Sequence, residues 1–345
     1  MELSLYGWDD DYSPALARAC AEHRKPLEAG RVVASSRGWC RVVCASGERD
    51  AALSGALLES ESAARPATGD WIALEPDTGR IRAVLDRRAC VSRKKAGKAN
   101  EEQVIAANVD VLLLVMGLDG DYNPRRLERY LLLAAESRAE PVVVLNKSDL
   151  CDNLVSRLGE IDRLTRASVV VMSALVPGAV EQLHRYVEPG RTAALVGMSG
   201  TGKSTIANLL LGGLRQATSE VRAEDGRGRH TTTSRELFLL PQGWLLVDTP
   251  GMRELEVWRE GGAVEAAFDD IAQVALSCRF RDCSHQGEPD CAVALAVRDG
   301  RLEAERVANF QKLSRETSAQ WIKRRNKLLC KAQNQMYRSG LRNKR

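Results

Sequence analysis

Eight residues have the types and spacing of a loop that binds nucleotide phosphates. They read Gly197, Met198, Ser199, Gly200, Thr201, Gly202, Lys203 and Ser204, and Thr205 follows. Small residues let such a loop curl until successive backbone N–H groups point at phosphate oxygens, while Lys203 brings positive charge to the β- and γ-phosphates and Ser204 can hold Mg²⁺. An apolar segment precedes the loop and a helical segment, 204–211, follows it, so the helix also directs its positive end at the anion. We therefore predict a nucleoside triphosphate site in which Lys203 takes part in catalysis.

A second motif, directly after an apolar segment, predicts which base is bound. It reads Asn146, Lys147, Ser148 and Asp149. The Asp149 carboxylate can accept hydrogen bonds from N1–H and N2–H₂ of guanine, whereas adenine would leave it unpaired, and such a site can reject the wrong base by about 10⁴-fold. We expect Asn146 to tie this motif to the phosphate loop, the Lys147 stem to lie along the base, and Ser173 and Ala174 to complete the pocket. The structural alternative is that Ser148 or Asp149 caps a helix.

A third group of residues is suited to Mg²⁺ and to sensing the γ-phosphate. Asp248 follows an apolar segment and opens the sequence Asp-Thr-Pro-Gly, in which the N–H of Gly251 can contact the γ-phosphate. The glycine-rich segment 226–233 precedes it, and we expect Thr232, or failing that Thr231, to close on Mg²⁺ when the γ-phosphate is present. The alternative for these threonines is an edge strand.

The order of these motifs is that of a circularly permuted GTPase, since the guanine motif precedes the phosphate loop. Gly251 then leads directly into the cysteine-rich segment that follows, and a γ-phosphate-driven movement could pass to it. Met252 stands where Ras-like enzymes place the glutamine that orients water. His230 is the nearest titratable residue that could position water, although it could equally be a polar loop residue.

Three cysteines and a histidine form a metal-ligand pattern, C-x₄-C-x-H-x₅-C. They are Cys278, Cys283, His285 and Cys291. Three thiolates and one imidazole complete a closed tetrahedral set, which is typical of one structural zinc ion and leaves no position open for hydrolysis. Buried free thiols beside a surface histidine are the alternative.

Composition fits a multidomain protein of a reducing compartment. The chain has 345 residues, a net charge of +4 and nine cysteines, six of them scattered singly, which argues against a secreted disulfide framework. The N-terminus turns acidic at once, and the apolar runs are too short to span a bilayer. We expect a cytoplasmic monomer without a membrane partner.

The pattern of apolar segments divides the chain into three expected domains. Residues 1–95 hold short strands, at 31–34, 39–44, 70–74 and 80–85, that suggest a small β-barrel. A flexible basic link over 92–98 follows. Residues 103–260 alternate apolar strands with helices, as in an α/β domain with a parallel sheet; the strands are expected at 109–116, 141–145, 168–172, 193–196 and 244–247. Residues 261–345 hold the metal pattern and a basic helical tail.

The tail is the most basic part of the chain. Residues 317–345 contain nine Lys or Arg and no Asp or Glu, with Trp321, Leu328 and Met336 recurring at helical spacing. A cationic helix face of this density suggests phosphate contacts with RNA, and a small barrel often presents an RNA-binding face. A solvated helix end is the alternative.

The combined motifs resemble the ribosome small-subunit-dependent GTPase A family, RsgA or YjeQ. The permuted order and the Cys/His spacing carry the resemblance over nearly the whole chain, and the stretches 68–71 and 102–110 and a helix start at 124 also match. The resemblance implies an N-terminal OB-fold, a permuted P-loop GTPase domain and a C-terminal zinc domain. It implies binding to the small (30S) ribosomal subunit and its rRNA late in maturation, with subunit-stimulated GTP hydrolysis driving release. The family's hydrophobic replacement of glutamine maps to Met252, and its switch histidine maps to His230.

Two other functions fit the same motifs. The chain could be a GTP-gated RNA-binding module in which hydrolysis only resets binding. It could also be a permuted GTPase that acts on another RNA, such as tRNA or the large subunit.

Overall fold

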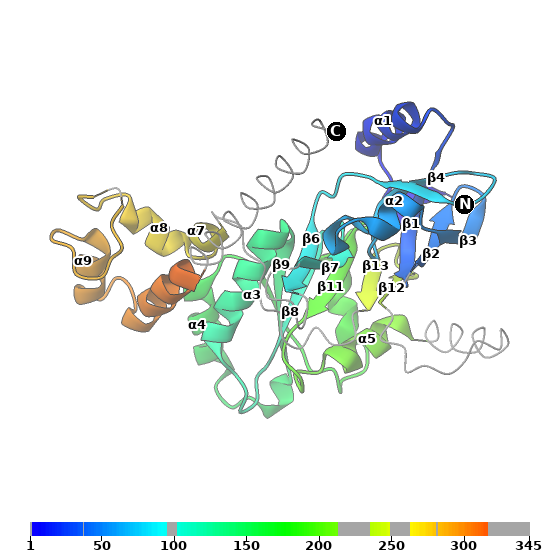
Figure 1. The fold of residues 1–345 in the computed structure, drawn as a ribbon. Helices are drawn as coiled ribbons and strands as arrows, with labels where there is room; N and C mark the ends of the chain where they lie inside the picture. Colours follow the sequence, from blue (N-terminus) through cyan, green and yellow to red (C-terminus); the bar gives the residue numbers. More distant parts are fainter. Residues whose placement is uncertain are drawn as a thin grey trace, which may run out of the picture. The chain divides into compact units, whose positions relative to one another are not determined.

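The computed structural model describes six stretches of the chain, and every structural statement below concerns them. They are residues 2–36, 38–94, 102–212, 235–248, 263–280 and 282–316. The chain separates into two compact units, Met1–Val257 and Trp258–Arg345, which are described separately (Figure 1).

The first unit is built on a mixed sheet whose centre is parallel. The parallel strands, in spatial order, are β10 (Ser168–Val171), β9 (Glu140–Asn146), β8 (Val111–Gly117), β11 (Thr192–Val196) and β13 (Leu245–Asp248). Strands β8 and β11 are buried along their whole length, as their unbroken apolar sequences predict. The predicted parallel sheet is therefore confirmed, and the carboxyl ends of its strands meet at one edge, where α/β proteins bind ligands.

Helices and short helical turns connect these strands. They are α3 (Pro124–Ser137), η4 (Ser148–Leu150), α4 (Leu154–Leu164), η5 (Ala179–Arg185) and α5 (Lys203–Leu211). Helix α3 begins with a clear local signal, because the Asn123 side chain accepts a hydrogen bond from the Arg126 N–H and Pro124 occupies the first helical position. The helix start predicted at residue 124 is thus confirmed.

Strand β12 (Glu236–Leu239) extends the sheet beyond its parallel part and was not predicted. It pairs antiparallel with β13 on one side and with β1 (Glu28–Ser35) on the other, through Ala34 and Glu236. Figure 1 shows the blue N-terminal strands beside the yellow strands β12 and β13. The parallel strands and the N-terminal strands therefore belong to one hydrogen-bonded sheet.

The N-terminal strands return on themselves. They are β1, β2 (Trp39–Cys44), β3 (Gly47–Ala52), β4 (Trp71–Leu74) and β5 (Ile81–Val84). Antiparallel pairs join β1 to β2, β2 to β3, β1 to β4 and β4 to β5, and a parallel bridge between Leu53 and Ile81 brings the end of β3 to β5. Helix α2 (Gly55–Glu59) and the turn η3 (Ser62–Ala64) lie between β3 and β4. Apolar side chains from these strands fill the interior, among them Val32, Val42, Ile72 and Ile81.

A helical N-terminus covers part of these strands. It comprises η1 (Leu3–Tyr6), η2 (Asp10–Tyr12) and α1 (Ser13–His23). Trp8 and Tyr12 pack on the buried Trp71 of β4, with ring centroids 4.9 and 5.7 Å from it. The short aromatic N-terminus thus belongs to the core of this region.

The predicted flexible link is partly wrong. Strand β6 (Cys90–Lys94) pairs antiparallel with β7 (Glu102–Ala107), so residues 92–94 form a strand. Basic composition suggested a linker, whereas a partner strand more distant in the sequence makes it a hairpin. Residues 95–101 lie outside the described part of the chain.

A buried arginine joins the N-terminal strands to the parallel sheet. Arg31 is 2% exposed and donates hydrogen bonds to the Asn108 carbonyl (3.3 Å) and to Oγ1 of Thr192 at the start of β11 (3.1 Å). Its guanidinium also lies over the Trp71 ring, 4.9 Å from the centroid. Burial lowers the pKa of Arg31 to about 10, so it stays charged at neutral pH.

The stretch Thr68–Trp71 makes the other contacts of this junction. Thr68 donates through Oγ1 to the Arg235 carbonyl (3.0 Å). The carboxylate of buried Asp70 accepts two hydrogen bonds of 2.7 Å from Arg87. Gly69 accepts a hydrogen bond from the Asn108 amide (3.1 Å). These residues, which help to carry the family resemblance, therefore hold the junction together.

The second unit consists of short helices. They are α7 (Ala263–Ala267), α8 (Asp269–Ala275), α9 (Ala292–Arg298) and a helical segment over 304–316. Phe268 is fully buried and contacts Phe310 edge to face, at 5.6 Å between centroids. Arg306 is 4% exposed and donates two hydrogen bonds to Asp270, at 2.7 and 2.8 Å.

No helix within the described residues combines the length and the apolar character needed to span a membrane.

The Gly69→Ala substitution should destabilise the first unit strongly. Gly69 has φ +88°, and a Cβ there would lie 2.2 Å from the backbone oxygen of Ala107. We expect the free energy of unfolding to fall by about 2–4 kcal/mol, measured by urea unfolding with tryptophan fluorescence. Gly159→Ala is the control, because its helical position meets nothing within 4 Å and the change should stabilise by about 0.5–1 kcal/mol. An equal effect of both substitutions would contradict this account.

Candidate functional site

The loop after β11 folds tightly around one of its own carbonyl groups. Thr201 donates through Oγ1 to the Met198 carbonyl (3.0 Å), and the Lys203 ammonium donates to the same oxygen. A Cβ at Gly197 would lie 2.3 Å from the Val115 oxygen, so only glycine lets the loop leave β11 this close to β8. The loop thus holds Lys203 at its centre, where a ligand phosphate could take the place of the Met198 oxygen.

The Asn146 amide connects three loops. Asn146 ends β9 and is 2% exposed; its Nδ2 donates to the Thr201 carbonyl (2.9 Å) and its Oδ1 accepts from the Ala174 N–H (2.9 Å). The amide orientation is fixed by these partners, since a flipped amide would face both with the wrong group. Asn146 therefore ties its own motif to the phosphate loop, as expected from sequence, and also to the segment Ser173–Ala174.

Gly202 lies next to that amide. It has φ +95°, caps the N-terminus of α5, and a Cβ there would lie 2.1 Å from Nδ2 of Asn146. The second glycine of the motif is thus required both for backbone conformation and for contact between two sequence-distant motifs.

Asp149 lies in the turn η4, which contacts the segment that follows β10. The Ser148 N–H donates to the Met172 carbonyl (3.2 Å), which fixes η4 against the residue that follows β10. Asp149 is exposed, and Ser173 is 4% exposed. The helix-capping alternative does not apply, because Lys147 and Asn153 stand at the N-caps of η4 and α4.

Lys147 has a partner that the sequence analysis missed. Its ammonium forms an ion pair with Asp119, and the Lys147 backbone is left-handed, with φ +63°. The Lys147 hydrogen bond is the main cause that lowers the pKa of Asp119. The sequence signal that could have indicated this pair is position, because Asp119 follows β8 and Lys147 follows the neighbouring strand β9.

The residues expected at Mg²⁺ are only partly described. Ser204 and Thr205 are exposed in the first turn of α5, and Asp248 ends β13, which neighbours β11. The other expected residues lie outside the described part of the chain and remain predictions: His230, Thr231, Thr232, Gly251 and Met252.

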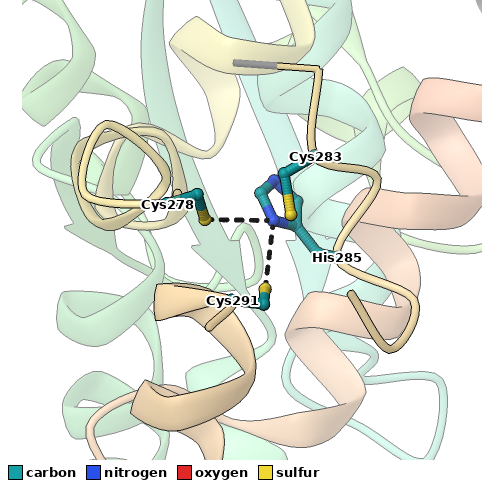
Figure 2. A group of neighbouring side chains, drawn as sticks. All are labelled: Cys278, Cys283, His285 and Cys291. Atoms are coloured by element: carbon teal, nitrogen blue, oxygen red, sulfur yellow. Dashed lines mark hydrogen bonds between the residues drawn. The ribbon is translucent and has the colours of Figure 1, made fainter. Parts of the chain in front are cut away.

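The second unit brings the four expected metal ligands together. The ligand atoms of Cys278, Cys283, His285 and Cys291 all lie within 4.8 Å of one another, and Figure 2 shows the three thiols around the imidazole. Nδ1 of His285 lies 3.6 Å from Sγ of Cys278 and 3.5 Å from Sγ of Cys291. With zinc–ligand bonds of the usual length, a tetrahedral N···S edge is about 3.6 Å. The donor set therefore fits a tetrahedral zinc ion.

The pKa values of the cysteines and the histidine in this cluster shift in different directions. Burial would raise the pKa of Cys278, but the N–H groups of Val293 and Ala292 and the neighbouring thiols lower it. Burial and the other two thiols raise the pKa of Cys283 to about 11. Burial lowers the pKa of His285, which favours the neutral imidazole that binds metal.

Glu288 and Gln311, which the sequence analysis did not single out, hold the ligand loop in place. The Glu288 carboxylate accepts from the Ser284 N–H (2.8 Å), the Ser284 hydroxyl and the Gln286 N–H (2.7 Å), which lower the pKa of Glu288 to about 2. Gln311 donates to the His285 carbonyl (2.5 Å). The His285 backbone is left-handed, with φ +58°, so these contacts hold a turn that the chain would not favour alone.

Comparison with known proteins gives consistent matches. The sequence model described as RsgA GTPase matches residues 84–258. The "Small ribosomal subunit biogenesis GTPase RsgA" of Opitutus terrae is 45% identical over 332 residues, covering 92% of this chain and 90% of that protein. The protein of the same name from Leptospira interrogans serovar copenhageni is 42% identical over 324 residues, covering 92% of this chain and 89% of its own.

Solved structures match as well. The crystal structure of YjeQ from Thermotoga maritima superposes with a TM-score of 0.65 at 26% identity, covering 85% of this chain and 99% of that one. YloQ, described as a circularly permuted GTPase, has the same fold, with a TM-score of 0.61 at 21% identity, covering 86% and 97% of the two chains.

The Gly202→Ala substitution should break the Asn146 bridge. The new Cβ would displace the Asn146 amide and leave buried partners unsatisfied, so we expect the free energy of unfolding to fall by about 2–4 kcal/mol. Urea unfolding provides the measurement. Gly200→Ala is the matched control, because Gly200 has a similar φ of +85° but meets nothing within 4 Å; it should cost only about 1–2 kcal/mol. Equal losses would show that backbone strain, not the Asn146 contact, sets the cost.

Proposed function

The chain belongs to the RsgA GTPase family, and from this we propose that it hydrolyses GTP on the small ribosomal subunit late in the maturation of that subunit. Subunit binding stimulates hydrolysis, and hydrolysis drives release. The observation that carries the proposal is the Asn146 bridge, which brings the guanine motif and the phosphate loop together in permuted order. Identity above 40% to relatives named as small-subunit biogenesis GTPases, over nine tenths of the chain, supports the ribosomal role.

We assign the phosphate loop to the triphosphate of GTP. Backbone N–H groups over Gly197–Ser204 would surround the phosphates, and Lys203 would exchange the Met198 carbonyl for the β- and γ-phosphates. Ser204, Asp248 and Thr232 would hold Mg²⁺, which supplies positive charge to the same phosphates when bound. Thr205 extends the loop, and Gly251 would contact the γ-phosphate.

We assign the base pocket to guanine. Asp149 would accept from the guanine N1–H and N2–H₂, and the Lys147 stem would lie along the ring. Ser173 and Ala174 form the third side of the pocket and are held there through Asn146.

Hydrolysis requires a group that positions water, and Met252 cannot do so. We propose His230 for this role and Thr232 as the switch threonine. Because the pocket alone lacks the usual glutamine, turnover of the free chain should be slow until a partner completes the site.

We propose that residues 1–95 form an OB-fold, 103–260 the permuted GTPase domain and 261–345 a zinc domain. The strand pairing supports the first assignment: five strands in the order β3-β2-β1-β4-β5, with the Leu53–Ile81 bridge returning to the start, match a small five-stranded barrel. Barrels of this type bind oligonucleotides. We therefore propose that the barrel and the basic segment 317–345 contact rRNA. We place the protein in the cytoplasm as a monomer.

We propose that Cys278, Cys283, His285 and Cys291 hold one structural zinc ion. The fit of the N···S distances supports zinc, and the closed set of four ligands argues against catalysis there.

GTP turnover should rise by at least about 10²-fold when small ribosomal subunits are added. The reason is that a catalytic group supplied by a partner can raise the kcat of a GTPase by about 10³-fold or more. Phosphate release with and without subunits provides the measurement. The His230→Ala substitution should remove most of the stimulation but leave GTP binding intact, whereas His23→Ala, a change in α1, should have no effect.

Sedimentation with a non-hydrolysable GTP analogue separates the alternatives. Co-migration with small subunits is expected. GTP-dependent binding without stimulated turnover would instead indicate an RNA-binding module, and co-migration with large subunits or tRNA would indicate another target.

Zinc content should be one ion per chain, measured by elemental mass spectrometry. The Cys283→Ser substitution should reduce it and make the second unit sensitive to proteolysis, because structural zinc supplies much of the folding energy of small domains. Cys151→Ser is the control, since Cys151 lies outside the cluster. Full zinc retention by the Cys283 variant would contradict this ligand assignment.

A further inference from the structure

The side chain of Asp119 lies at the carboxyl end of β8, beside the guanine motif on β9. We infer that Asp119 is a positioning residue for guanine-nucleotide binding, which fixes the Lys147 side chain before the nucleotide arrives. The inference rests on the proposed function, because it concerns the same pocket. Asp119 touches neither the phosphate loop nor Asp149 in any described hydrogen bond or ion pair, so it would act through Lys147.

The Asp119 carboxylate is itself fixed. Its Oδ1 accepts from the Asp121 N–H (3.3 Å), while Oδ2 pairs with the Lys147 ammonium. A Cβ at Gly117 would lie 2.7 Å from Oδ1 of Asp119, so glycine at this position avoids a steric clash with the Asp119 carboxylate. One oxygen therefore orders the loop after β8, and the other is directed at Lys147.

Backbone contacts hold the two partners at neighbouring strand ends. Gly117 and Asn146 are paired in the parallel register of β8 and β9, and the Leu118 N–H donates to the Asn146 carbonyl (2.8 Å). Asp119 and Lys147 each follow directly from these residues. The ion pair is thus part of the same structure that places the Asn146 amide against the phosphate loop.

The ion pair restricts the conformation of the Lys147 side chain that would contact the base. Lysine is among the side chains with the most rotamer freedom to lose on ordering, and the left-handed Lys147 backbone sets the direction in which the stem leaves the chain. Pairing with Asp119 fixes the ammonium, which leaves the methylene stem as a pre-ordered surface for the guanine ring. Both side chains are largely shielded, with exposures of 28% and 22%, so solvent weakens the pair less than it would at an open surface.

A competing role for Asp119 makes the opposite prediction. If the nucleotide needed the Lys147 ammonium elsewhere, Asp119 would compete with the nucleotide, and removing its charge would tighten binding. If Asp119 only folded its own loop, removing its charge while keeping Oδ1 as an acceptor would leave binding unchanged.

The Asp119→Asn substitution separates these roles, because the amide oxygen can still accept from the Asp121 N–H while the charge on Lys147 loses its partner. Asp121→Asn is the matched control, since it removes the same charge from an exposed side chain in the same loop. Binding of fluorescent N-methylanthraniloyl-GDP and -GTP to the full chain gives the dissociation constants. We expect Asp119→Asn to raise both by about three- to tenfold, with kcat unchanged at saturating GTP and Asp121→Asn within twofold of wild type.

The Lys147→Met background completes the test. Methionine keeps an apolar stem without the ammonium, so Asp119→Asn should have no further effect there. Unchanged or tighter binding by Asp119→Asn, or an equal loss in the Lys147→Met background, would overturn the inference. Should Asp119→Asn fail to fold, Lys147→Met alone must weaken binding by a similar factor for the inference to stand. A wild-type chain that binds neither nucleotide would instead overturn the proposed function.

Discussion

The fold of the nucleotide site depends on one buried amide. Asn146 can make its two hydrogen bonds only if the phosphate loop and the segment after β10 both reach the end of β9. Loss of either bond would leave a buried polar group without a partner, which costs about 1–3 kcal/mol. Because chain order does not enter this geometry, the same convergence is possible in a permuted domain. The amide therefore explains how motifs in reversed order can serve one nucleotide.

The parallel sheet and the site motifs could be predicted because their signals are local. The segments around 112, 143 and 194 are apolar without interruption, and a buried parallel strand requires little more. Strand β12 and the pair of β6 and β7 were missed. The sequence around β12 does not reveal its distant partner β1, and the basic composition after β6 pointed to a linker and not to a strand. Asp119, Glu288 and Gln311 were missed for a related reason: each acts through a neighbour in space, and a single carboxylate or amide after a strand has no distinctive pattern.

The sheet that carries the nucleotide motifs is also joined to the N-terminal strands. Strand β12 begins just after the segment that holds the expected switch threonine, and it pairs with β1 of the N-terminal strands. Thr68 binds the Arg235 carbonyl at the same place, and Arg31 reaches Thr192, on the strand that enters the phosphate loop. The N-terminal strands are therefore attached both to β12 and to the amino end of β11, the strand that leads into the phosphate loop.

The two sites of the chain differ in what they leave open. The Cys/His cluster directs four ligand atoms at one common centre, with Glu288 and Gln311 holding the loop from outside. A zinc ion bound by all four would have no position open for a substrate. The phosphate loop instead satisfies Lys203 with a carbonyl of its own, an interaction that a phosphate can replace. A lysine held in this way is already directed inward, so binding exchanges one acceptor for a stronger one and does not have to order a free side chain. The proposed chemistry therefore lies in the first unit, and the proposed structural zinc in the second.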